Sequence, residues 1–160
     1  MHSIVALEPR YPMTTHPVVE NAPASVAKKS WTRFLPAIGR ILLGLPMVIF
    51  GLNGFLNFIP PPPTPLPAGA AAFSTALMNT GYMMQLIGGT QLLAGLLLVA
   101  NRFVPLALVL LAPFFVNSIA FHAVLEHGGL LPALIFFALE LALAWHYRKA
   151  YASLFVAKWK

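Results

Sequence analysis

The chain has no cysteine among its 160 residues. That absence excludes disulfides, thiolate metal sites and thiol redox chemistry. Charge is also scarce, because charged residues make up only 9 % of the chain while hydrophobic residues make up 59 %. A soluble domain of this length would need far more charge to cover its surface. We therefore expect much of the surface to face lipid.

Four long apolar blocks follow a proline-containing N-terminal segment. They cover residues 36–59, 82–100, 103–124 and 130–147. Each has roughly the 17–25 residues that a helix needs to cross a bilayer, and helix is the form that satisfies the backbone there. The sequence predicts an all-α polytopic membrane protein, a compact four-transmembrane-helix bundle over 31–155. Residues 1–30 are predicted to be a disordered cytoplasmic tail, and 156–160 a basic cytoplasmic C-terminus.

The net charge of +6 does not indicate nucleic-acid binding, because Lys and Arg flank apolar blocks instead of forming one continuous face. With four crossings, all ten of these residues fall on one side: in the N-terminal segment, at the start of the first block (Arg40), around Arg102 and after the last block. The positive-inside rule then predicts that both termini are cytoplasmic. The predicted location is a bacterial inner membrane, with the lipid bilayer as the first partner.

The loop after the first block reads "PPPPTPLPAGAAAFSTALMNTG". Residues 68–78 can form a helix, but a continuous helix from there through the second block would have about 33 residues and a length of about 50 Å. That is too long for a hydrocarbon core of about 30 Å without steep tilt. We expect a break at 79–81, with Asn79 or Thr80 as the cap, and a short interfacial helix before it. The alternative is that this loop is only a stiff connector.

Glycine marks one face of the second block. Gly81, Gly88 and Gly95 recur every seven residues and so form one stripe. Small residues allow close helix approach, which drives association in lipid. The two-residue turn 101–102 predicts that the second and third helices are antiparallel neighbours, and the short connection 126–129 predicts the same for the third and fourth.

Two polar residues are predicted near the bilayer midplane. Gln91 lies about nine residues into the second block and Glu140 about ten into the fourth. An interhelical hydrogen bond between them would contribute about 0.6 kcal/mol. The alternative is a proton-handling or ligand-binding role.

A second polar group is predicted in the outer half of the bundle. Its candidate residues are Asn53, Asn57, Gln85, Ser118, His122 and Glu126. Asn53 and Asn57 share a helix face, while Ser118, His122 and Glu126 form an i, i+4, i+8 stripe. Asn117 is rotated by about 140° from His122 and is assigned instead to the backbone groups that Pro113 disturbs. We predict an outward-opening ligand pocket, with a plain interfacial role for His122 as the alternative.

Metal and haem sites are not expected. His122 and His146 lie near opposite membrane faces, whereas axial haem ligation needs both at one level. Glu126 and His127 are the only acid and imidazole close to His122. No phosphate loop, nucleophile elbow or zinc-protease motif is present, and "SIVAL" near the start is too short for a signal-peptide core.

The pattern resembles the DoxX-like family of small four-helix integral membrane proteins. The resemblance rests on "GRILLGLPMVIFGLNGF", "GGTQLLAGLLLVANRFVPLAL", "LAPFFVNSIAFH" and "YRKAYASLF", which together span roughly residues 39–155. Arg40 and Gly44 resemble the residues that open the family's first helix, and Gly95 resembles the glycine of its second. Gln91 stands where many relatives have Glu, and the Lys often found near the end of the first helix is replaced by Asn53 or absent.

Some members of that family are associated with quinone-linked sulfur oxidation or with membrane redox complexes. The resemblance implies a small redox-associated or quinone-interacting membrane subunit that works with redox-enzyme partner proteins. Such a subunit would be accessory to an enzyme more readily than an enzyme by itself, with quinone as the candidate ligand and no covalent cofactor. The alternatives are a non-catalytic membrane scaffold and a small-molecule carrier.

Overall fold

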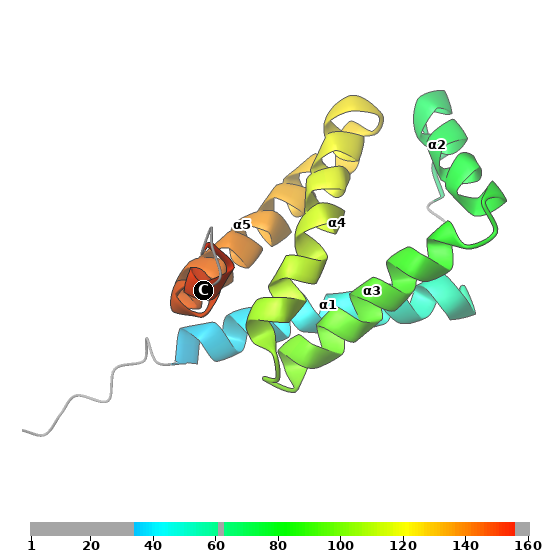
Figure 1. Cartoon of the computed structure of the whole chain (residues 1–160). Coiled ribbons are helices and arrows are strands. Elements are labelled where there is room, and N and C mark those ends of the chain that lie inside the picture. Colours follow the sequence, from blue (N-terminus) through cyan, green and yellow to red (C-terminus); the bar gives the residue numbers. More distant parts are fainter. Residues whose placement is uncertain (1–33, 61–62, 156–160) are drawn as a thin grey trace, which may run out of the picture. The chain divides into compact units, whose positions relative to one another are not determined.

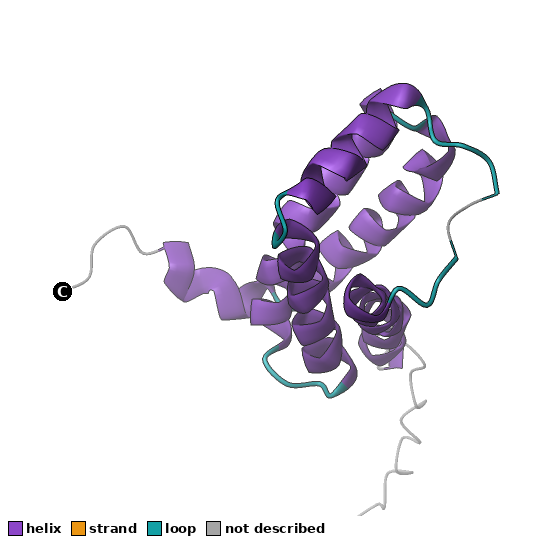
Figure 2. Cartoon of the chain, turned by 90° about the vertical axis from the view of Figure 1, so that its right-hand side faces the viewer, coloured by secondary structure: helices purple, strands orange, loops and turns teal. Residues whose placement is uncertain are grey.

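The computed structural model describes residues 34–60 and 63–155, all of which belong to one compact unit, Trp31–Lys160. The predicted N-terminal tail, 1–30, and the predicted basic C-terminus, 156–160, lie outside the described residues. Every regular element in the described ranges is a helix, and no strand occurs there (Figure 2). The all-α prediction is confirmed.

Five α-helices and two short 3₁₀ segments make up the described chain (Figure 1). The α-helices are α1 (Leu35–Leu56), α2 (Ala68–Asn79), α3 (Met83–Val99), α4 (Val104–Val124) and α5 (Leu130–His146). The 3₁₀ segments are η2 (His127–Gly129) and η3 (Arg148–Phe155). These bounds lie within one or two residues of the predicted blocks, except at the end of α1.

The first helix ends at Leu56 and not at residue 59 as predicted. Asn57 adopts the left-handed conformation, with φ 48°, and its backbone N–H donates to the Asn53 carbonyl oxygen. Asn is one of the few residues that visit this conformation readily, and a left-handed residue is a common way to end a helix. Apolar composition beyond Asn57 therefore does not extend the helix.

The predicted helix before the second crossing is present as α2, and the chain bends by 90° between α2 and α3. Gly81 takes a φ of +76° in this bend. The Thr80 hydroxyl oxygen accepts a hydrogen bond from the Met83 N–H at 3.0 Å, so Thr80 satisfies one of the free donors at the start of α3. The break is where the sequence predicts it.

The most extensive contact between elements is between α1 and α3, which run antiparallel. Glycines make this contact close: a Cβ added at Gly51 would lie 2.5 Å from the Leu92 nitrogen, and one at Gly95 would lie 2.8 Å from the Gly44 oxygen. A Cβ at Gly88 would lie 3.0 Å from the Gly51 oxygen. The backbones approach so closely only because both helices carry glycine there.

Gly81 is not part of this contact, although the heptad spacing places it on the same stripe. It lies in the bend before α3, and no atom comes within 4 Å of a Cβ built on it. The glycine stripe of α3 therefore has two members, Gly88 and Gly95. Their partners are Gly44 and Gly51 of α1, which are also seven residues apart.

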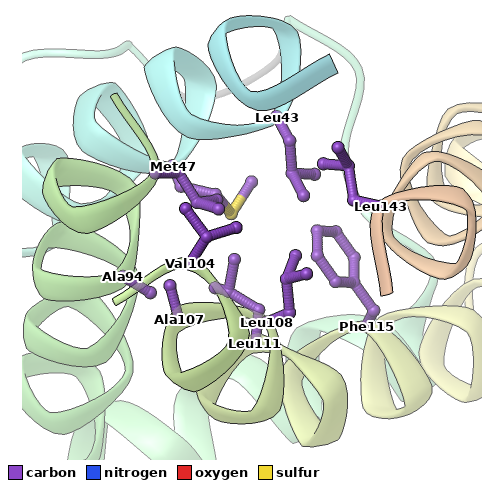
Figure 3. Packing of buried hydrophobic residues seen from close by; sticks show 10 residues of the cluster. Leu43, Met47, Ala94, Val104, Ala107, Leu108, Leu111, Phe115 and Leu143 are labelled. Carbon is purple, nitrogen blue, oxygen red and sulfur yellow. The ribbon is translucent and has the colours of Figure 1, made fainter. Parts of the chain in front are cut away.

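Apolar side chains from α1, α3, α4 and α5 meet in one cluster (Figure 3). Leu43 and Met47 enter it from α1, and Leu143 enters from α5. The other members are Ala94, Leu98, Val104, Ala107, Leu108, Leu111 and Phe115. The four helices thus share a core to which α2 contributes nothing.

Three described helical segments are long and apolar enough to cross a membrane, namely Leu35–Leu56, Val104–Val124 and His127–His146. The bent pair of α2 and α3 would provide a fourth crossing if it counts as one span. Many large apolar side chains on these helices point outward, among them Val124 at 73 % and Trp145 at 71 % exposure. Outward apolar surface on this scale is typical of helices that contact lipid.

Candidate ligand site between α2, α3 and α4

Two cavities, of about 370 Å³ and about 300 Å³, lie where α2, α3 and α4 meet. They share five lining residues, which are Phe73, Leu77, Ile87, Phe114 and Asn117. Four of these five are apolar, and Asn117 is the exception. A mostly apolar cavity with a few polar groups is the usual character of a small-molecule site.

The helix α2 forms one wall of these cavities, because it bends away from α3 and lies against the end of α4. The Phe73 ring packs against the Phe121 ring, with centroids 5.5 Å apart. A Cβ at Gly69 would lie 3.2 Å from the Leu125 side chain, so α2 and the end of α4 also approach each other there. The α2 segment that the sequence predicts as an interfacial helix therefore forms one wall of the candidate site.

Asn117 lines the candidate site, although the sequence predicts a different role for it and leaves it out of the pocket. Its side chain is exposed and lines both cavities, although it lies in the middle of the apolar helix α4. Among the described residues its amide has no hydrogen-bond partner, and it does not repair the backbone near Pro113 as predicted. An amide without a partner is costly in an apolar environment. The signal in the sequence is that Asn117 is polar and directly precedes Ser118, a predicted pocket residue.

Ser118 and His122 line the smaller of the two cavities together with Asn117. Both also line a further cavity of about 210 Å³ between α1, α4 and α5, to which Met47, Phe50 and Phe136 contribute. One polar stripe of α4 therefore borders cavities on two sides.

Glu126 and His122 form the most highly connected polar group in the described chain. The Glu126 carboxylate accepts hydrogen bonds from the Gly128 N–H at 2.7 Å and the Gly129 N–H at 2.9 Å. The His122 Nδ1 lies 2.7 Å from Glu126 Oε2 and 3.0 Å from the Glu126 carbonyl oxygen. The hydrogen bonds from Gly129, Gly128 and His122 lower the pKa of Glu126 below its ordinary value. Glu126 thus caps η2 and holds the His122 ring.

Four members of the predicted pocket do not line the cavities between α2, α3 and α4, namely Glu126, described above, and three residues that lie elsewhere in the fold. Asn53, Asn57 and Gln85 are not among the residues that line the cavities between α2, α3 and α4. The Asn53 Oδ1 accepts a hydrogen bond from the Ile59 N–H at 2.7 Å, so Asn53 and Asn57 together end α1. Gln85 is exposed on α3. Of the predicted pocket residues, only Ser118 and His122 line these cavities. The prediction grouped residues by their depth along the helices, and depth does not say in which direction a side chain points.

Gln91 and Glu140 are both buried, at 6 % and 3 % exposure. The predicted hydrogen bond between them is absent, since neither carboxyl oxygen of Glu140 has a hydrogen-bond partner. Gln91 shares the α3 face of Gly88 and Gly95, which packs on α1. Glu140 lies one turn from Leu143, which a Cβ at Gly39 would touch at 3.1 Å. The two residues therefore belong to different helix contacts.

Two hydrogen bonds and one cation–π contact lie near the start of α1 and the end of α5. The Arg40 guanidinium donates to the Tyr147 hydroxyl at 2.8 Å, and the Tyr151 hydroxyl donates to the Pro105 carbonyl at 3.3 Å. Burial, and then the nearby charge of Glu140, raise the pKa of Tyr151. The Arg148 guanidinium lies 4.9 Å from the centre of the Trp145 ring, a cation–π distance.

Within residues 34–60 and 63–155, no three His, Cys, Asp or Glu side chains come together in a group that could hold a metal ion. The comparisons with family models, curated proteins and solved structures found no match to this chain. Its function therefore has to be argued from the site itself.

Proposed function

We propose that this chain is a multi-pass protein of the bacterial inner membrane in which α1, α3, α4 and α5 cross the bilayer as a bundle. Support comes from the outward apolar surface of these helices and from the positions of the described basic residues. Arg40 near the start of α1, Arg102 before α4, and Arg148 and Lys149 after α5 all fall at the helix ends that would face the cytoplasm. In this arrangement α2 lies at the opposite, outer interface.

The function that we propose within this membrane domain is the binding of a small, mostly apolar molecule with a polar head group. A quinone is the candidate that fits this description. The observation that carries the proposal is Asn117, an amide without a partner in the middle of α4, at the wall of two apolar cavities. A ligand atom or water that bonds to this amide would remove the cost of leaving it unpaired.

The DoxX-like resemblance supports the same reading, since it implies a small membrane subunit associated with redox enzymes. We propose that the chain binds its ligand on behalf of such a partner protein. None of the candidate residues forms a nucleophile–base pair that would argue for independent catalysis.

The experiment is purification in mild detergent, followed by solvent extraction and mass spectrometry for co-purifying quinone and partner proteins. Ile87→Trp fills the space shared by both cavities and is expected to reduce the recovered ligand at least fivefold. Leu93→Trp is the matched control, because Leu93 is an exposed residue of the same helix at 52 % exposure. It is expected to retain the ligand.

A wild-type protein that carries no small molecule would overturn the ligand-binding proposal. Equal ligand content in the two tryptophan variants would overturn the assignment to these cavities. Partner proteins recovered without any ligand would favour the scaffold alternative.

A further inference from the structure

At the border of the candidate site, two oxygen atoms of Glu126 determine which ring nitrogen of His122 carries a hydrogen. The Nδ1 atom has two neighbours within hydrogen-bond distance, the Glu126 Oε2 at 2.7 Å and the Glu126 carbonyl oxygen at 3.0 Å. A backbone carbonyl is an acceptor only, and an ionised carboxylate is too. Glu126 remains ionised because the Gly129 and Gly128 N–H groups and His122 lower its pKa. Nδ1 therefore carries a hydrogen.

This arrangement decides the chemistry of the other ring nitrogen. When one nitrogen of a neutral imidazole carries the hydrogen, the other presents a lone pair and accepts a hydrogen bond. Nε2 makes no hydrogen bond to any of the described residues. In its neutral form, His122 therefore offers a free acceptor and no donor at Nε2.

The ring is also held in place. A Cβ at Gly129 would collide with the His122 ring, which shows that the ring fills the space in front of this glycine. The Phe121 ring contacts it edge to face, with centroids 5.1 Å apart. His122 lines the cavity of about 300 Å³ together with Ser118 and Asn117, so a fixed acceptor borders the space in which the ligand is proposed to bind.

We propose that His122 selects ligands whose head group carries a hydroxyl, which donates a hydrogen bond to Nε2. The ligand class is a phenol-like or quinol-like molecule with an apolar body, and the corresponding ether or carbonyl compound binds more weakly. This inference rests on the proposed ligand-binding function and adds to it the chemical form that the site prefers. Glu126 acts as a positioning residue, because it sets the state of His122 without lining the cavity itself.

The test uses two probes of nearly the same shape, 2-naphthol and 2-methoxynaphthalene, with the purified full-length protein in detergent at pH 8, where an imidazole is ordinarily neutral. Only the naphthol has a hydroxyl hydrogen to donate. The wild-type protein is expected to bind 2-naphthol about 10-fold more tightly, the ratio that one hydrogen bond of ordinary strength produces. His122→Phe is expected to bind both probes alike.

Ser118→Ala is the matched control, because Ser118 lines the same cavity one turn before His122 on α4. It is expected to keep the preference for naphthol. Loss of the preference in Ser118→Ala and not in His122→Phe would assign the acceptor to the serine and overturn the inference. If His122→Phe does not fold, ¹⁵N spectra of the wild-type imidazole decide, because 2-naphthol should shift the resonance of Nε2 and leave that of Nδ1 in place.

The outcomes separate this inference from the proposal on which it rests. If neither probe binds to the wild-type protein, the cavities are not a ligand site and the proposed function fails. If both probes bind with equal affinity, the ligand site stands and the role of His122 as selective acceptor fails.

Discussion

The two described acidic residues have opposite surroundings. Glu126 accepts hydrogen bonds from two backbone N–H groups and lies against His122. Glu140 is buried at 3 % exposure, and neither of its carboxyl oxygens has a hydrogen-bond partner. A buried polar group without a partner loses its hydration and gains nothing in return. We therefore expect the Glu126 carboxylate to stabilise the folded protein and the Glu140 carboxyl group to destabilise it.

Replacement of Glu140 by Leu should stabilise the protein. The substitution removes an unpartnered polar group from an apolar site and breaks no hydrogen bond, which gives a gain of about 1–3 kcal/mol. The measurement is the midpoint of thermal unfolding in detergent. Glu140→Gln, which keeps a polar amide in place, should raise the midpoint less. A lower midpoint for Glu140→Leu would show that the carboxyl has a stabilising partner.

The contribution of Glu126 should depend on pH. Because its pKa is lower in the folded protein than the ordinary value of 4.5, its stabilising effect is fully present above pH 4.5 and is lost as the pH falls through the lowered folded value. The thermal midpoint of the wild type should exceed that of Glu126→Gln at pH 6, and the difference should disappear on acidification. A difference that stays constant down to pH 3 would contradict the role of the carboxylate charge.

At the scale of elements, α1 and α3 depend on glycine for their contact. The same helices contain a natural control, because a Cβ on Gly89 of α3 would lie 3.7 Å from its nearest neighbour, Phe55, whereas one on Gly51 would lie 2.5 Å from the backbone of Leu92. A backbone atom cannot move aside as the end of a side chain can. The two positions therefore should respond differently to one methyl group.

Gly51→Ala should destabilise the protein by about 1–3 kcal/mol, the usual cost of overpacking. Gly89→Ala should be neutral or stabilising by up to about 1 kcal/mol, because alanine favours a helix over glycine. Thermal unfolding of both variants in the same detergent makes the comparison. Equal destabilisation by the two variants would contradict the close contact between α1 and α3.

The helix bounds were largely predictable at this scale, because apolar length, prolines and turn residues act locally. The end of α1 was not. Residues after Asn57 are apolar and could have continued the helix, but the left-handed Asn57 and the side chain of Asn53 end it. Their polarity and shared helix face place the two asparagines in the predicted pocket, although Asn is also a residue that ends helices.

At the scale of the whole molecule, the orientation in the membrane can be tested with single cysteines, because the natural chain has none. Arg102→Cys lies in the exposed turn between α3 and α4, and Thr64→Cys lies in the exposed loop before α2. In right-side-out cells a membrane-impermeant maleimide should label Thr64→Cys and leave Arg102→Cys unlabelled until the membrane is opened. Labelling of Arg102→Cys in intact cells would reverse the proposed orientation.

The sequence by itself determined that this protein is helical and where most helices begin and end. It predicted four crossings, and the structure has three helices long and apolar enough to cross a membrane, or four if the bent pair of α2 and α3 counts as one span. These properties depend on residues close together in the chain. Only the tertiary structure decided that Asn117 borders the cavities, that Asn53 does not, and that Gln91 and Glu140 stay apart. The reason is that each helix can rotate about its axis, and this rotation is set by the packing of side chains and glycines from different helices.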